Sequence, residues 1–286
     1  MEQILQVVIS GLLSGGIYSL SSVGLALIFG VVGLVNFAHG EFLMIAMYIS
    51  FFIYSLFGLD PYQSMILTLI IMTFVGYLTF KGIMERVLYA DHEIQILITL
   101  GISIVLQNVA LILFKADYRN VRIGLSTSTF DIGQMTFSSG RVIAFFIAIG
   151  ASMLLYLFLK KTFIGSAMRA ISQNNKAAKL MGIKLTNTYM LAYVIGITLV
   201  GLAGVLIIPM YPAFPTVGNN FILPSFIVVV IGGLTSVPGA IVGGLLVGVI
   251  ENLTAYLIGP AYQQAGYFLL FILVVIFKPN GLLGRS

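Results

Sequence analysis

The sequence contains no cysteine and no tryptophan, and only 8% of its 286 residues are charged. The absence of cysteine excludes disulfides, thiolate metal sites and cysteine nucleophiles. Soluble domains carry about 25% charged residues, so a chain with so few cannot cover a surface that faces water. Because 59% of the residues are hydrophobic, the composition predicts an all-α, polytopic membrane protein, in which tyrosine is the remaining aromatic anchor for the interfaces.

Apolar runs of membrane-spanning length recur throughout the chain. A helix needs about 20 apolar residues to cross roughly 30 Å of hydrocarbon. The segment Ile4–Phe57 is about twice that length and must turn near its middle, and its start lacks the basic residues of a cleaved signal peptide. Further spans are expected at 62–83, 94–114, 141–160, 187–211, 238–258 and 263–278. The run 221–233 is short and is interpreted as a thin or re-entrant helix, which gives eight or nine transmembrane helices.

Signatures of catalysis and of nucleotide binding are missing. The sequence has no GxxxxGK[ST] phosphate loop, no GxSxG elbow and no HExxH. Its two histidines, His39 and His92, are far apart in the sequence, and no loop is large enough to form a soluble ATPase domain. We therefore expect no catalytic residue, no metal site and no cofactor bound by this chain.

The net charge of +5 is distributed unevenly. Six of the fourteen basic residues fall between positions 160 and 184, and no Asp or Glu occurs between Asp131 and Glu251. Because short basic loops stay cytoplasmic, the loop of about 161–186 is expected to face the cytosol and not to bind nucleic acid. The long loop of about 115–141 then lies on the outer face, and the alternation in STFDIGQMTFSSG predicts a small hairpin there.

The basic loop also has helical periodicity. Its apolar residues fall on one stripe, formed by Ile164, Met168, Ile171, Ala178, Met181 and Leu185. Ser166 is expected to cap the start of this helix and Gly182 to end it. The stripe requires burial, either in the lipid headgroup layer or in a groove of a partner protein, and the residues alone favour neither. The plainest alternative is a solvated basic loop.

A second candidate is the turn inside the first apolar segment, NFAHGEF. Asn36 and His39 are three residues apart and share a helix face, while Gly33 and Gly40 permit a break. In the structural interpretation, Asn36 caps the next helix and Glu41 complements its dipole. In the functional interpretation, Asn36, His39 and Glu41 line a substrate pathway, because a free helix N-terminus suits a carboxylate. The run VGNNFILPSF has a weak likeness to this turn, which we attribute to chance.

The stretch GGLTSVPGAIVGGLLVGVIENL combines small residues with an acid. The pairs Gly239/Gly243 and Gly244/Gly248 have the small-xxx-small spacing that lets membrane helices pack closely. Glu251 is embedded in the same apolar run, which makes it a candidate for the substrate pathway. The alternative is a boundary position in which Glu251 pairs with a basic neighbour.

Two neighbouring amides, Gln107 and Asn108, lie within the expected span 94–114. Amides in lipid usually hydrogen-bond across helices. We therefore interpret both as links between helices, with a place on the substrate pathway as the second interpretation.

With these residues in view, the chain resembles, over nearly its whole length, the H-type permease subunits of bacterial ABC importers for branched-chain amino acids. The resemblance is carried by VNFAHGEFLM (35–44), ITLGISIVLQN (98–108), GSAMRAISQNNKAAKLMGI (165–183), GGLTSVPGAIVGGLLVGVIE (232–251) and FKPNGLLG (277–284). The motif NFAHGEF favours the H-type over the M-type subunit. A single permease domain, 1–286, is what the resemblance implies.

The resemblance gives the basic loop a role. In that family the loop supplies a coupling helix that docks into an ATP-binding subunit. The positions concerned here are Met168, Arg169, Ile171, Asn175, Ala178, Met181 and Gly182. The implied partners are an M-type permease, two ATP-binding cassette subunits that carry the ATP and Mg, and a periplasmic amino-acid-binding protein, besides membrane lipid. The implied location is the bacterial inner membrane.

Two departures from the family pattern leave alternatives open. A basic residue that often precedes GG is absent from LPSFIVVVIGG, and Lys278 stands where arginine is usual. Permeases for urea and short amides share much of the pattern and are the alternative within the class. A self-sufficient secondary carrier, with Glu41 or Glu251 as a proton or sodium site, and a scaffold without transport activity are the rivals from other classes.

Overall fold

The computed structural model describes residues 2–121, 128–133 and 135–284, and eight of the helices described are long and apolar enough to cross a membrane. They are α1 (Glu2–Val32), α2 (His39–Phe57), α3 (Pro61–Thr79, continuing through a π-helical turn, Phe80–Met84, into α4, Glu85–Val87), α5 (His92–Phe114), α7 (Ser139–Lys161), α10 (Leu185–Ile207), α12 (Val237–Leu257) and α13 (Gln263–Phe277, preceded by a 3₁₀ turn, Pro260–Tyr262). The prediction of an all-α, polytopic membrane protein is confirmed, with eight spans within the described ranges.

The remaining elements are short. They are the helices α8 (Phe163–Gln173), α9 (Asn175–Leu180) and α11 (Asn219–Gly232) and the strands β1 (Thr129–Ile132) and β2 (Met135–Ser138). The strands pair antiparallel, with Thr129 opposite Ser138, as the alternation in the sequence predicts. The expected span 187–211 ends earlier, at Ile207, because three prolines (Pro209, Pro212 and Pro215) follow within the connection to α11.

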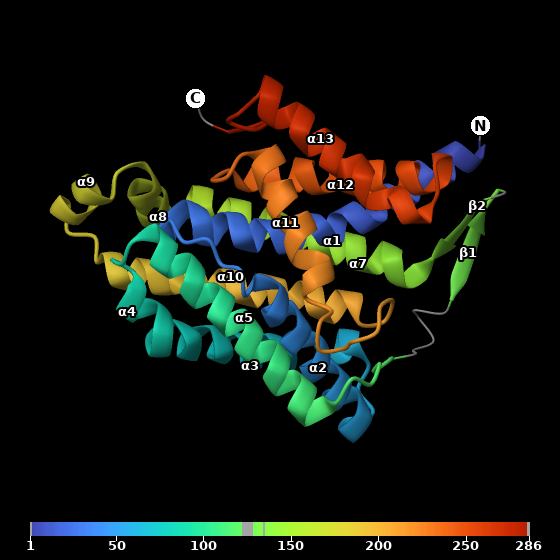
Figure 1. Cartoon of the computed structure of the whole chain (residues 1–286), viewed down its shortest axis with the longest axis horizontal. Coiled ribbons are helices and arrows are strands. Elements are labelled where there is room, and N and C mark those ends of the chain that lie inside the picture. The colour runs from blue at the N-terminus through green and yellow to red at the C-terminus, as the bar shows by residue number, and fades with distance from the viewer. Residues whose placement is uncertain (1, 122–127, 134, 285–286) are drawn as a thin grey trace.

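The long helix α1 is the centre of the bundle, and it packs against α12, α10 and α7 (Figure 1). Small residues let the backbones approach. A Cβ atom added at Gly15 would come within 2.8 Å of the Leu245 Cα atom in α12, and one added at Gly24 within 2.7 Å of the Gly196 carbonyl oxygen in α10. In lipid the hydrophobic effect does not drive helices together, because the acyl chains are as apolar as the side chains. Helices therefore associate through close van der Waals packing of this kind.

The helices α2 and α11 both begin inside the bundle, and their first residues are in contact. Residues 33–38 are not helical, and α2 starts after them, while α11 has only 14 residues. A Cβ atom added at Gly218 would lie 2.6 Å from the carbonyl carbon of Gly40. From this contact, which we call the helix-break junction, α2 and α11 run in opposite directions (Figure 1). The sequence likeness that we attributed to chance thus belongs to two segments that meet in the fold.

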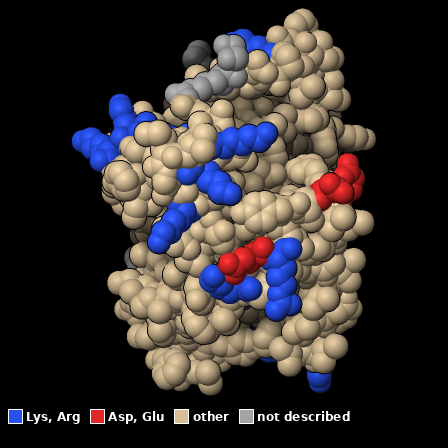
Figure 2. Space-filling view, turned by 90° about the vertical axis from the view of Figure 1, so that its left-hand side faces the viewer, with Lys and Arg blue, Asp and Glu red and all other residues tan. Residues whose placement is uncertain are grey.

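The two ends of the bundle differ in charge. Nine of the twelve lysines and arginines described lie at the end formed by α8, α9, α4 and the C-terminal segment, which we call the α8–α9 end (Figures 1 and 2). The other three, Lys115, Arg119 and Arg141, follow α5 or begin α7 at the opposite end of the bundle, which we call the hairpin end because β1 and β2 lie there. There Arg119 exchanges two backbone hydrogen bonds of 2.9 Å with Ala213, which ties the loop after α5 to the connection between α10 and α11.

Candidate functional site

The helix-break junction carries a buried polar cluster. Glu41, in the first turn of α2, is only 1% exposed. The Gln107 side chain of α5 donates through Nε2 to Glu41 Oε1 at 2.6 Å and to Asn219 Oδ1 at 3.2 Å, and Asn219 is in the first turn of α11. The shorter of the two bonds joins this amide to a carboxyl group that is almost fully buried. One amide therefore links the starts of both broken helices to a third helix.

His39 joins the same region to α1. Its Nε2 atom lies 3.0 Å from the Ser21 carbonyl oxygen, and the Ser21 hydroxyl is hydrogen-bonded to the Ser225 hydroxyl of α11 at 2.9 Å. The expected capping of α2 by Asn36 is wrong. Asn36 Oδ1 accepts from the Ala38 N–H at 3.2 Å, which closes a turn before the helix begins, and Ala38 occupies the cap position.

Some buried polar atoms of this cluster have no hydrogen-bond partner among the residues that the structure describes. Within the described ranges, His39 Nδ1 and Glu41 Oε2 are buried and have no hydrogen-bond partner. Buried polar side chains are normally bonded to protein or to water. The junction can therefore accept water or another polar group, and it brings together four of the residues that the sequence suggested for a pathway, Asn36, His39, Glu41 and Gln107.

A second polar site is a cavity of about 320 Å³ in the half of the bundle nearer the hairpin end, which we call the hairpin-side cavity. Side chains from α1, α7, α11, α12 and α13 surround it, among them Tyr18, Arg141, Asn220, Glu251, Gln264 and Tyr267. Ligand sites in proteins have volumes from about 300 Å³ upward and carry a few convergent polar groups. The cavity has both properties.

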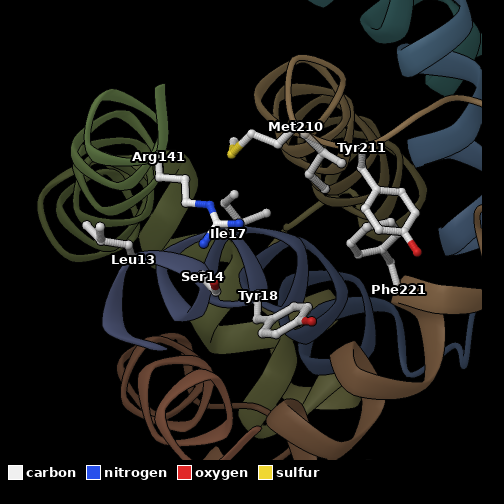
Figure 3. Close-up of a pocket in the computed structure, with 9 residues that line it drawn as sticks. Leu13, Ser14, Ile17, Tyr18, Arg141, Met210, Tyr211 and Phe221 are labelled. Atoms are coloured by element: carbon white, nitrogen blue, oxygen red, sulfur yellow. The ribbon is translucent and has the colours of Figure 1, made fainter. Parts of the chain in front are cut away.

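An apolar recess of about 140 Å³ adjoins this cavity and shares five of its lining residues. Its own walls are Leu13, Ile17, Ile207 and Met210. Figure 3 shows Arg141 reaching from α7 toward Ser14 and Ile17 of α1, with Tyr211 and Phe221 on the far side. The rings of Tyr211 and Phe221 meet edge to face, with centroids 5.8 Å apart. The recess and the cavity together form a pocket with one polar and one apolar part.

The two opposite charges of the cavity, Arg141 and Glu251, do not pair with each other. The described part of the chain contains two side-chain ion pairs, Lys81–Glu85 and Arg119–Asp117, and neither involves the cavity. The neighbour of the Glu251 carboxylate is the hydroxyl of Tyr18. The alternative in which Glu251 pairs with a basic residue at the boundary is therefore wrong for the described residues.

The sequence missed Arg141, Tyr18 and the recess. Arg141 is the first charged residue of its span. In the sequence alone it looks like an ordinary basic residue at a membrane interface, and only the packing of α7 against α1 places it in the cavity.

Asn108, in contrast, belongs to neither polar site. Its Nδ2 atom donates to the Ile104 carbonyl oxygen of its own helix at 2.8 Å, on an exposed face.

The four glycines of α12 face two different helices. Gly239 and Gly243 lie against Gly232 and Val228 of α11. Gly244 and Gly248 lie against α1, where a Cβ atom added at Gly244 would be 2.5 Å from the Ser19 backbone nitrogen. Two offset small-residue pairs on one helix thus bring α1 and α11, which both line the hairpin-side cavity and contact each other, against different faces of α12.

The basic loop differs from the single amphipathic helix that its periodicity predicts. The first cap is Thr162, whose Oγ1 accepts from the Gly165 N–H at 3.0 Å, and not Ser166. Asn174 then ends α8 and caps α9, accepting from the Ala177 N–H at 3.0 Å. The loop is therefore two short helices with a bend between them, and a glycine with positive φ, Gly182 (84°), follows the second.

The apolar stripe of this loop is also divided. Its central side chains, Met168, Ile171 and Ala178, are buried inside this chain, so the expectation that they await a partner is wrong. Three other side chains are exposed: Phe163 (87%), Leu180 (88%) and Met181 (83%). We call them the apolar edge. Arg169 is exposed as well, and its guanidinium bonds to Ser166 Oγ at 3.1 Å.

Comparison with known proteins identifies relatives that match nearly the whole chain. A family model described as the permease component of branched-chain amino acid transport systems matches residues 7–277. The high-affinity branched-chain amino acid permease BraD of Pseudomonas aeruginosa is 33% identical over 295 aligned positions, covering 98% of this chain and 96% of the relative. The LivH permease of Escherichia coli K12 is 30% identical, with the same coverage. A probable LivH of Methanocaldococcus jannaschii is 29% identical over 93% of this chain and 88% of its own. No solved structure matches the chain significantly.

Proposed function

Because the chain belongs to the family of permease components of branched-chain amino acid transport systems, we propose that it forms half of the translocation pathway of an ABC importer for leucine, isoleucine and valine. The relatives are named as branched-chain amino acid permeases, which favours these substrates over urea or short amides. The chain itself is non-catalytic, and partner subunits bind ATP and Mg and hydrolyse the nucleotide.

The distribution of charge supports an orientation for this multi-pass membrane protein. Short segments rich in lysine and arginine stay on the cytoplasmic side, so the α8–α9 end faces the cytoplasm (Figure 2). The hairpin end and the hairpin-side cavity then face outward, toward a periplasmic binding protein that delivers the amino acid. In a bacterium the membrane concerned is the inner membrane.

The observation that carries the proposal is the arrangement of the two ends. A cavity with charged walls lies toward one end, and exposed apolar side chains on a basic surface lie at the other. Leu180 and Met181 are adjacent at the end of α9 and both exposed, and exposed apolar patches mark sites that bind a protein or a membrane. The apolar edge, Phe163, Leu180 and Met181, is therefore proposed as the docking surface for an ATP-binding cassette subunit. A second, M-type permease would complete the pathway.

The test is transport by the complete assembly in proteoliposomes. The chain is co-expressed with an M-type permease and two ATPase subunits, and uptake of radiolabelled leucine is measured with the binding protein added outside and ATP inside. We expect uptake that requires both ATP and the ATPase subunits. Leucine uptake by this chain alone, driven by a proton or sodium gradient, would overturn the proposal and favour a secondary carrier.

A further inference from the structure

The hairpin-side cavity contains two opposite charges that are both available. Arg141 and Glu251 line the same space, and within the described ranges neither forms an ion pair. Glu251 is partly buried beside the Tyr18 hydroxyl, whereas the Arg141 side chain is exposed, so both charged groups can be reached from the space of the cavity. Two opposite, separated charges on the walls of one cavity suit a ligand that carries a negative and a positive group of its own.

The chemistry of the two side chains defines which group binds where. A guanidinium presents a planar fork of N–H donors that matches the two oxygens of a carboxylate. A carboxylate, such as that of Glu251, accepts hydrogen bonds from an ammonium group, and the adjacent Tyr18 hydroxyl is a further polar group at the same place. Arg141 and Glu251 come from different helices, α7 and α12, so the two contacts fix the ligand across the cavity.

The recess beside the cavity defines the rest of the ligand. Its walls, Leu13, Ile17, Ile207 and Met210, are all aliphatic, and Arg141 and Tyr18 line both the recess and the cavity. A molecule whose charged groups are held by Arg141 and Glu251 would therefore place an attached side chain near this wall. The volume of about 140 Å³ suits a small branched chain, and the hydrophobic effect rewards its transfer from water.

We propose that this pocket is the substrate site of the permease, in which Arg141 binds the α-carboxylate of an aliphatic amino acid, Glu251 binds its α-ammonium group and the recess takes its side chain. The proposal rests on the proposed function and names the residues that give it selectivity. The pocket is also joined to the helix-break junction, because Asn219 at the junction and Asn220 in the cavity are consecutive residues of α11.

The test uses the complete reconstituted importer with saturating loaded binding protein and compares leucine imported per ATP hydrolysed. Glu251→Gln keeps the size of the side chain and removes its charge, and Arg141→Gln removes the charge and keeps a shorter polar side chain. Loss of a hydrogen bond to a charged group corresponds to a change of about 10- to 100-fold. We expect the ratio of leucine to ATP to fall by roughly that factor, while ATP hydrolysis is still stimulated by the binding protein.

Two further variants separate the site from a structural role. Arg119→Gln is the matched control, because Arg119 lies at the same end but is paired with Asp117 outside the cavity, and its ratio should stay at the wild-type value. The exchange Arg141→Glu with Glu251→Arg should recover part of the coupling that Arg141→Glu alone removes, since a zwitterion can bind in the reversed direction. Ile207→Phe fills the recess and should lower leucine import more than valine import.

The outcomes are distinct. A wild-type assembly that imports no leucine overturns the proposed function together with the site. Import by the wild type and an unchanged ratio in Arg141→Gln and Glu251→Gln overturns the site alone. If import and stimulated ATP hydrolysis fall in parallel in both variants, the two residues have a structural role and the proposed site is overturned. The site is also overturned if chloride competes with leucine as strongly as valine does, because the pocket would then bind any anion.

Discussion

The exchange of Leu180 and Met181 for alanine tests the proposal that the apolar edge is the docking surface for an ATP-binding cassette subunit. These two side chains are 88% and 83% exposed and sit at the end of α9, next to Gly182. In isolation the exchange removes side chains that touch little of this chain. The fold and the hairpin-side cavity should therefore be unaffected, and the whole effect should fall on docking of the ATPase subunit.

The magnitude follows from the area available for burial. Complete burial of a large apolar side chain contributes about 1.5–3 kcal/mol. If docking covers about half of each of the two side chains, their removal costs about 1.5–3 kcal/mol in total. At about 1.4 kcal/mol per factor of ten, the affinity for the ATPase subunit falls by roughly 10- to 100-fold.

The assay is retention of the ATPase subunits when the complex is purified through a tag on this chain, together with ATP hydrolysis stimulated by loaded binding protein. A matched control is Met153→Ala with Leu154→Ala, an exposed Met–Leu pair in the middle of α7, which should retain the ATPases. If the α9 variant also retains them and responds normally to the binding protein, the apolar edge is not the docking surface. A helix that lies on lipid instead would make the variant sensitive to anionic lipid.

Two further substitutions test the packing of the bundle by thermal unfolding in detergent. Gly244→Ala places a Cβ atom against the α1 backbone and should destabilise the fold by about 1–3 kcal/mol. Gly101→Ala is the control and should be neutral, because no heavy atom from another part of the described chain lies within 4 Å of the added Cβ. Equal melting temperatures of the two variants would contradict the close packing. Gln107→Leu removes the donor to Glu41 and should lower the free energy of unfolding by about 1–3 kcal/mol. Asn108→Leu loses only a hydrogen bond within its own helix and should lower it less. The reverse order would contradict the role of Gln107 as the link between helices.

Most of the membrane topology could be predicted from the sequence, because span length and apolar composition are local properties of the chain. The eight spans and the β1–β2 hairpin follow from runs and alternation that need no tertiary contact. The caps were harder to place. Asn36 and Ser166 both have suitable side chains, yet Ala38 and Thr162 occupy the cap positions, since the start of a helix depends on where the preceding chain is held.

The polar sites could be predicted only in part. Asn36, His39, Glu41 and Gln107 come together as polar residues in an apolar chain often do, but Glu251 lies in a different site with Arg141. The stripe of the basic loop gave no sign that Met168 and Ile171 are covered by this chain while Met181 is exposed. A periodic pattern shows which residues share a face, and it does not show which neighbour covers that face.

The central position of α1 has a consequence for the synthesis of the protein. α1 leaves the ribosome well before its main neighbour α12, which begins at Val237, roughly 200 residues after α1 ends at Val32. At about 5–20 residues per second, the ribosome needs on the order of 10–40 s to cover that distance. Throughout this interval the face of α1 that carries Gly15 and Ser19 has no α12 to contact. We therefore expect the nascent chain to use a temporary neighbour, a translocation channel or a membrane chaperone, that shields this polar and glycine-rich face from the acyl chains until α12 has been made.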